Sequence, residues 1–340
     1  MKVYAGMDPR MPLAAVADYA QRVERLGFDG LHVAETIHDS LAVALLALEH
    51  TTRITVRTSV TLAFVRSPTL VAYTAWDLAV LSGSRFELGL GSQIKQNITG
   101  RFGMPWSEPR ARMRDYLGAL DALFTVFRTG GPLSFDGESY QLTRLQPYFN
   151  PGPDVDVTPP PVWLGAVNAG MCELAGELAC GVVTHSTNAD PGYLRSVVRP
   201  ALDRGAAAAH RRQTPSIIAS CAIATGADDA ALARDRERQR GMLAFLYSTP
   251  AYAPALDRQG LTDLGDRLRA VVKGDRWQEL PSVLTDEVLD TLLVCGRYDE
   301  LPAILLARYE GLADGVQLPQ IAGTGDDGPL RECIRALQAG

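Results

Sequence analysis

Two stretches of this chain have residue types suited to holding a flat ligand and an anion. Residues 86–92 read Phe-Glu-Leu-Gly-Leu-Gly-Ser, a short apolar run that ends in glycines. Glycine lets the backbone approach a planar ligand and adopt dihedral angles that other residues resist. Residues 165–170, Gly-Ala-Val-Asn-Ala-Gly, lead into a predicted helix, whose first N–H groups attract anions. Taken alone, this second motif is weak, because any strand–helix turn can be rich in glycine.

Composition excludes several other functions. The net charge is −6, and arginines are interspersed with acidic residues, which argues against a nucleic-acid-binding face. The five cysteines are scattered without a Cys-x-x-Cys motif, so we expect neither a disulfide framework nor a metal site. The chain begins with an apolar strand and has no apolar run of about 18 residues, the length needed to span a membrane. We therefore expect a cytoplasmic protein that does not bind membranes.

The elements that position these stretches follow a repeated pattern, in which a helix ends, a glycine follows and a short β-rich run begins. Residues 26–33, 178–184 and 312–318 each show it. This recurrence is typical of a parallel α/β sheet. Eight strands are predicted, at residues 3–5, 31–34, 54–62, 86–90, 162–165, 182–184, 217–224 and 316–318.

Eight strand–helix units favour a (β/α)8 TIM barrel, an α/β fold, over a doubly wound sheet. No third glycine follows Gly89 and Gly91 at the spacing of a dinucleotide-binding fold. We predict a single domain over residues 1–340, with insertions after strands 4 and 7. The insertions are expected at about 93–110, 130–161 and 247–286. Because all three contain aromatic residues, they are interpreted as ordered lids over the site.

Several phrases of the sequence together resemble the bacterial luciferase-like flavin oxidoreductases, a superfamily of (β/α)8 barrels. They are residues 27–35 (GFDGLHVAE), 58–61 (TSVT), 81–91 (LSGSRFELGLG), 161–166 (PVWLGA) and 174–183 (LAGELACGVV). The resemblance covers nearly the whole chain in order. Within the superfamily, the chain looks most like the branch that uses the deazaflavin coenzyme F420.

The resemblance implies a cofactor-binding role for the third strand. In the family, the pair at the position of Ser59 and Val60 forms a non-proline cis peptide that backs the flavin ring, and Thr61 follows it. An ordinary buried β-strand is the alternative, because the same residues would suit one.

For catalysis, the resemblance points to the loop after the second strand. Glu35 aligns with an acidic residue of the family, and Thr36 stands where many deazaflavin enzymes have histidine. Glu35 is expected to act as an acid or to hold the loop. His38, or Asp39, is a second candidate for the missing imidazole, although a loop histidine is more often only solvated.

The remaining candidate residues are expected to contact the cofactor. Gly91 and Ser92 would lie along the ring edge, and Asn97 aligns with an asparagine that binds the flavin pyrimidine in some relatives. The turn of Gly165, Ala166, Val167 and Asn168 corresponds to the phosphate cradle of the family. His185 and Ser186 would contact the phosphate or the side arm, or would only cap a helix.

The predicted activity is hydride transfer between F420 and a small organic substrate, either reduction of a C=C or C=N bond or oxidation of an alcohol. One alternative is an FMNH2-dependent two-component monooxygenase, and another is a non-catalytic flavin-binding relative. The long anionic tail of F420 needs a cationic groove, for which Arg101, Arg195 and Arg199 are candidates, although they would equally suit ordinary positions on helix surfaces. A homodimer is expected, through helices near strands two to four, where residues 41–48 are apolar.

Overall fold

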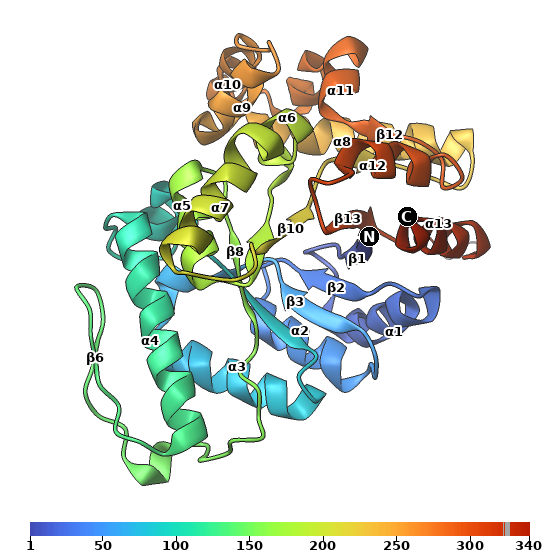
Figure 1. Ribbon diagram of the computed structural model, residues 1–340. Helices are drawn as coiled ribbons and strands as arrows, with labels where there is room; N and C mark the ends of the chain where they lie inside the picture. Colours follow the sequence, from blue (N-terminus) through green and yellow to red (C-terminus); the bar gives the residue numbers. More distant parts are fainter. Residues whose placement is uncertain (322, 324–326) are drawn as a thin grey trace.

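A closed barrel of parallel strands forms the centre of the molecule (Figure 1). The computed structural model describes residues 1–321, 323 and 327–340. The nine strands of the main sheet pair in the order β3-β2-β1-β13-β10-β9-β8-β5-β4, and β3 also pairs with β5, which closes the sheet. Since β3 and β4 are two parts of one barrel strand, this is an eight-stranded (β/α)8 TIM barrel, as predicted. The strands are β1 Lys2–Gly6, β2 Gly30–Val33, β3 Thr55–Thr58, β4 Thr61–Leu62, β5 Phe86–Gly91, β8 Val162–Gly165, β9 Gly181–Val183, β10 Ser216–Ala219 and β13 Gly315–Gln320.

Helices surround the barrel, and their ends carry the signals that the sequence predicts. Ser67 accepts a hydrogen bond from the backbone of Thr69 and caps α3, while Gly83 ends that helix with a left-handed φ of 60°. The barrel helices are α1 Val16–Leu26, α2 Ser40–Glu49, α3 Pro68–Ser82, α4 Pro109–Thr129, α5 Ala169–Leu178, α6 Pro191–Tyr193, α7 Arg199–Ala208, α12 Leu301–Tyr309 and α13 Gly328–Ala339.

Two predicted strands differ in detail from the structure. The third is interrupted at Ser59 and Val60, where the peptide bond is cis, as the resemblance implied. The seventh, predicted over residues 217–224, divides: β10 ends at Ala219, and Ile223–Ala224 forms β11, which pairs with β12 (Val294–Cys295) in a separate small sheet. The continuous β-rich pattern hides this exit because both halves are buried.

The lumen of the barrel contains a buried polar cluster around Arg57, which is 1 % exposed. Its guanidinium lies 3.7 Å from the centre of the Trp163 ring, forms an ion pair with Glu87 and donates to His32 Nε2 at 3.0 Å. His32 Nδ1 therefore carries the proton and donates to Gln317 at 3.0 Å. Burial, reinforced by Arg57, lowers the pKa of His32 to about 3.

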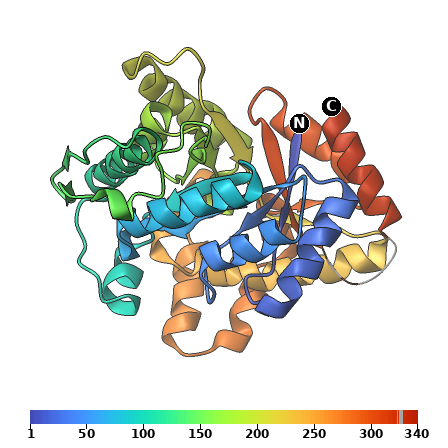
Figure 2. The same cartoon turned by 90° about the horizontal axis from the view of Figure 1, so that it is seen from below.

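The three insertions have different positions. Residues 93–110 lie at the carboxyl ends of the strands and include a π-helical turn, Asn97–Arg101. Residues 130–161 form a hairpin of β6 (Phe135–Asp136) and β7 (Gln141–Leu142), which lies beside α4 (Figures 1 and 2). The Phe149 carbonyl accepts from Tyr73 of α3 at 2.7 Å. The expectation that this middle insertion covers the site is wrong, because it packs on the outer helices.

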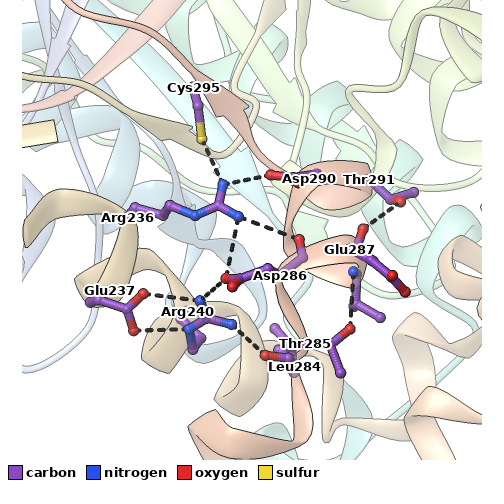
Figure 3. Close-up of polar contacts among 11 residues, drawn as sticks. Arg236, Glu237, Arg240, Leu284, Thr285, Asp286, Glu287, Asp290, Thr291 and Cys295 are labelled. Atoms are coloured by element: carbon purple, nitrogen blue, oxygen red, sulfur yellow. Dashed lines mark hydrogen bonds and ion pairs between the residues drawn. The ribbon is translucent and has the colours of Figure 1, made fainter. Parts of the chain in front are cut away.

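The insertion after β10 is built from α8 Asp229–Tyr247, α9 Ala253–Arg258, α10 Leu264–Lys273 and α11 Asp286–Leu292. These helices enclose a hydrophobic cluster that includes Leu243, Leu256 and Leu268. Ion pairs connect α11, at the end of the insertion, to α8 (Figure 3). Arg236 pairs with Asp290 at 2.7 Å and Arg240 pairs with Asp286 at 2.5 Å. The insertion thus has apolar and ionic contacts of its own.

The first and last described elements meet, because the amino group of Met1 donates to the Leu337 carbonyl at 3.0 Å. Within the described residues, no helix combines the length and apolar character needed to cross a membrane.

Candidate active site

A cavity of about 760 Å³ lies at the carboxyl ends of the barrel strands, where active sites of this fold are built. Its wall includes ten of the candidate residues: Glu35, Ser59, Val60, Gly91, Ser92, Gly165, Ala166, Val167, Asn168 and His185. Residues from the carboxyl ends of five barrel strands therefore meet here. Four candidates do not line it: His38, Thr61, Asn97 and Ser186.

Val60 occupies the floor of the cavity, between two glycines of neighbouring strands. A Cβ atom at Gly91 would lie 2.5 Å from Val60 Cγ2, and one at Gly165 would lie 3.0 Å from Val60 Cγ1. Side chains at either position would displace Val60 or the backbone. These glycines leave a flat surface against which a planar ring can lie.

Glu35 lies beside this floor, and hydrogen bonds occupy its carboxylate. Arg66 pairs with Oε1 at 2.7 Å, while the backbone N–H of Leu62 donates to Oε2 at 2.9 Å and Ser40 Oγ donates at 3.2 Å. Both carboxylate oxygens are therefore occupied by donors of the protein itself. This geometry favours the loop-holding alternative for Glu35.

The four candidates outside the cavity have structural surroundings of their own. Thr61 is fully buried and shares a 2.8 Å hydrogen bond with Ser40. Asn97 begins the π-helical turn, and Ser186 begins the 3₁₀ turn Ser186–Asn188. His38 is half-buried in the loop before α2.

The turn after β8 is held in shape by side chains of the next strand–helix unit. Asn168 caps α5 by accepting from the Met171 N–H at 2.9 Å. Asn188 donates to the Ala166 carbonyl at 2.8 Å, and Tyr193 donates to the Val167 carbonyl at 2.9 Å. The start of α5 thus faces the cavity with a fixed backbone, as an anion site requires.

His185 is a neutral polar group on the cavity wall. Its Nδ1 accepts from the Thr187 N–H at 3.4 Å and shares a 3.0 Å hydrogen bond with the Thr187 hydroxyl, so its proton resides on Nε2. The ring stacks on Tyr252 with centroids 5.0 Å apart. Burial lowers the pKa of His185 to about 4. The imidazole therefore offers an N–H donor to a ligand at neutral pH.

Two cations line the cavity, but they are not those expected from the sequence. Lys95 and Arg258 belong to the wall, and within the described residues neither forms an ion pair. Arg195 is exposed outside it, and Arg199 bonds the Pro215 carbonyl at the opposite end of β10 at 3.1 Å. Arg101 donates to the Thr36 carbonyl. The predicted arginine groove is therefore wrong in its residues.

Other wall residues were missed because they come from insertions without a regular pattern. Trp106 belongs to the first insertion, and Ala251, Tyr252 and Arg258 belong to the third. The aromatic content of both segments was the only signal in the sequence. It predicted lids but not which side chain enters the cavity.

Comparisons with known proteins agree with this geometry. An uncharacterized protein of Mycobacterium tuberculosis is 39 % identical over 325 residues, covering 95 % of this chain and 93 % of that protein. A 5,10-methylenetetrahydromethanopterin reductase of Methanolobus tindarius is 26 % identical over 333 residues, covering 95 % and 94 %.

Solved structures share the fold at low sequence identity. The coenzyme F420-dependent tetrahydromethanopterin reductase of Methanopyrus kandleri has a TM-score of 0.82 at 16 % identity, with 99 % of this chain and 98 % of that chain covered. An F420-dependent secondary alcohol dehydrogenase, in complex with an F420–acetone adduct, has a TM-score of 0.76 at 18 % identity, covering 99 % and 98 %. A Baeyer-Villiger monooxygenase component of Pseudomonas putida with FMN has a TM-score of 0.67 at 15 % identity, covering 99 % and 96 %.

The family model described as luciferase-like monooxygenase matches residues 2–315, which include every barrel strand except β13, of which only the first residue is matched. The chain therefore belongs to the luciferase-like monooxygenase family.

Proposed function

We propose that this protein is an oxidoreductase that transfers hydride between coenzyme F420 and a small organic substrate. The observation that carries the proposal is the cavity itself, which combines a flat glycine floor with two cations that have no carboxylate partner in the described part of the chain. A planar ring with a long anionic tail suits both features. Relatives and structural neighbours named as F420-dependent enzymes support the same choice.

In this proposal the protein positions the reactants. F420 supplies a carbon that accepts or donates hydride and reacts poorly with oxygen. Val60 and the glycines beside it back the ring, and Ser92 lies along its edge. Glu35 holds the floor through Leu62, and the turn of residues 165–168 binds the phosphate.

Among the candidate proton donors, His185 has the most suitable geometry. His185 lines the cavity and its Nε2–H has no hydrogen-bond partner among the described residues, whereas Glu35 is paired with Arg66 and His38 lies outside the wall. We therefore propose that His185 orients a substrate oxygen or nitrogen by hydrogen bonding. Glu35 and His38 remain the alternatives for the acid itself.

An FMNH2-dependent monooxygenase is the second candidate function, and the FMN complex among the structural neighbours favours it. A non-catalytic flavin-binding protein is the third. A homodimer and a cytoplasmic location complete the proposal.

Turnover of the coenzyme tests the function. Purified protein is incubated anaerobically with oxidised F420 and alcohols, and with reduced F420 and unsaturated or imine compounds, while the deazaflavin absorbance is followed. We expect substrate-dependent change with at least one class, slowed at least about tenfold in His185→Gln. His50→Gln, which changes an exposed histidine of the loop after α2, is the matched control. Turnover only with reduced FMN and oxygen would contradict the proposal.

A further inference from the structure

Arg258 is a cation at the end of α9 whose guanidinium is held by weak contacts. It lies over the Tyr193 ring, 3.9 Å from the centroid. Its Nη2 donates to the Thr187 carbonyl at 3.5 Å, the outer limit of a hydrogen bond. No carboxylate of the described residues pairs with it. Most of its five N–H donors are therefore available to a ligand.

The contacts of Arg258 place it beside the turn before α5. Tyr193, on which it stacks, donates to the Val167 carbonyl at 2.9 Å. Thr187, to which it donates, is followed by Asn188, which holds the Ala166 carbonyl. The guanidinium, the first N–H groups of α5 and the cavity thus share one corner.

The same corner contains a second donor. His185 is half-buried on the cavity wall, and its Nε2–H has no hydrogen-bond partner among the described residues. Its stacking partner Tyr252 comes from the insertion, as Arg258 does. Among the described residues, Glu35 is the only carboxylate on the cavity wall, and it pairs with Arg66. Within this part of the chain, the two donors therefore border a cavity whose wall carries no unpaired carboxylate.

We infer that Arg258 binds the phosphate of the cofactor side chain together with the turn of residues 165–168. The inference rests on the proposed function for the cofactor class, since a flavin-type ligand must occupy the cavity. A planar guanidinium matches two phosphate oxygens, and it is pre-oriented here by its stacking on Tyr193. Because Arg258 belongs to the insertion, a bound phosphate would link the insertion to the barrel.

Binding of ligands with and without phosphate tests this role. The full-length protein, Arg258→Gln, Arg258→Lys and Arg267→Gln are titrated anaerobically with F420 and with the deazaflavin that lacks the phosphate and tail. Arg267 is a matched control, because it is an exposed arginine of α10 outside the cavity wall. We expect Arg258→Gln to weaken F420 binding about 10- to 100-fold. Arg258→Lys should weaken F420 binding less than Arg258→Gln does. The phosphate-free deazaflavin should bind all four proteins equally.

A second measurement follows the link between insertion and barrel. F420 should slow backbone hydrogen exchange in residues 250–258 of the wild-type protein. The phosphate-free deazaflavin should not slow hydrogen exchange in this segment. In Arg258→Gln, F420 should no longer slow it.

The outcomes separate this inference from the proposed function. If FMN binds in place of F420, the proposed function fails, but Arg258→Gln must still weaken FMN relative to riboflavin. If F420 binds and Arg258→Gln has no effect, or has an equal effect on both deazaflavins, the inference is overturned and the proposed function stands. Failure of every flavin to bind would overturn both.

Discussion

At the scale of single residues, the cavity floor depends on steric fit between Val60 and two glycines. Gly91→Ala would bring a methyl group to 2.5 Å from Val60 Cγ2. We expect it to destabilise the protein by about 1–3 kcal/mol and to weaken cofactor binding at least tenfold. Urea unfolding and ligand titration measure the two effects.

The control for this prediction shortens Val60, so that the methyl group added at position 91 no longer meets Val60 Cγ2. The double variant Val60→Ala/Gly91→Ala should be more stable than the sum of the single changes by more than about 1 kcal/mol. Additive losses would mean that Gly91 is needed for some reason other than Val60.

The buried His32 predicts a pH dependence of stability. Its pKa is about 3 in the folded protein and about 6.5 when unfolded. Between these values the unfolded state binds the extra proton, so the free energy of unfolding falls as the pH decreases. From pH 6 to pH 5 this histidine contributes a loss of about 1.2 kcal/mol. His32→Gln should remove that part of the slope.

The pKa of His185 is also lowered by burial. In the His32→Gln protein, His185 should therefore still make the free energy of unfolding fall with decreasing pH, with a similar slope. Chemical unfolding at pH 7, 6 and 5 measures these slopes, with His50→Gln as the control for an exposed histidine. An unchanged slope in His32→Gln would show that burial and the nearby Arg57 do not keep His32 neutral in the folded protein.

At the scale of elements, the start of α5 combines a structural cap with the proposed anion site. Asn168→Ala removes the bond to the Met171 N–H and should cost about 1 kcal/mol of stability. Asn168→Asp keeps a capping oxygen but adds negative charge beside the proposed phosphate. It should retain stability and weaken F420 binding about tenfold, without affecting the phosphate-free deazaflavin.

Thermal unfolding and ligand titration of the two Asn168 variants check this separation. Asn168→Ser, which retains a capping oxygen without charge, is the control. If Asn168→Asp binds F420 as tightly as the wild-type protein, the phosphate does not lie at this turn.

Elements with a regular pattern were predictable from the sequence, and irregular ones were not. Glycine after a helix followed by a β-rich run marked the strands at residues 31–34, 182–184 and 316–318, and buried β-rich runs marked the other five. It also placed Gly91 and Gly165 at strand ends, where they meet. The exit of the chain after Ala219 was missed, since burial on both sides of Ser220 looks like one strand. Arg258 and Tyr252 could not be assigned, because their positions depend on how α9 packs.

At the scale of the whole molecule, α2 and α3 leave an apolar surface that suits a second copy of the chain. A groove of about 940 Å³ between them is lined mainly by leucines, valines and Trp76, with Asp39, Arg66 and Asp77 also on its wall. Leu70 and Val80 are 66 % and 54 % exposed. Exposed apolar surface of this kind commonly marks an interface. We expect a homodimer through these helices.

Light scattering during size-exclusion chromatography tests the dimer. Leu70→Asp should give a monomer at micromolar concentration, because it places a charge in the interface. Phe245→Asp is the control, since Phe245 is also exposed but lies on α8, away from the groove. A monomeric wild-type protein would contradict the expectation.

Anaerobic titration of the wild-type protein with oxidised F420 and, separately, with FMN tests the central claim most directly. Absorbance and fluorescence report the binding of each. The cavity, with its glycine floor and its two cations without carboxylate partners, predicts tight binding of F420 and much weaker binding of FMN. Preference for FMN would contradict hydride transfer with the deazaflavin and would favour oxygen-dependent chemistry in the same barrel.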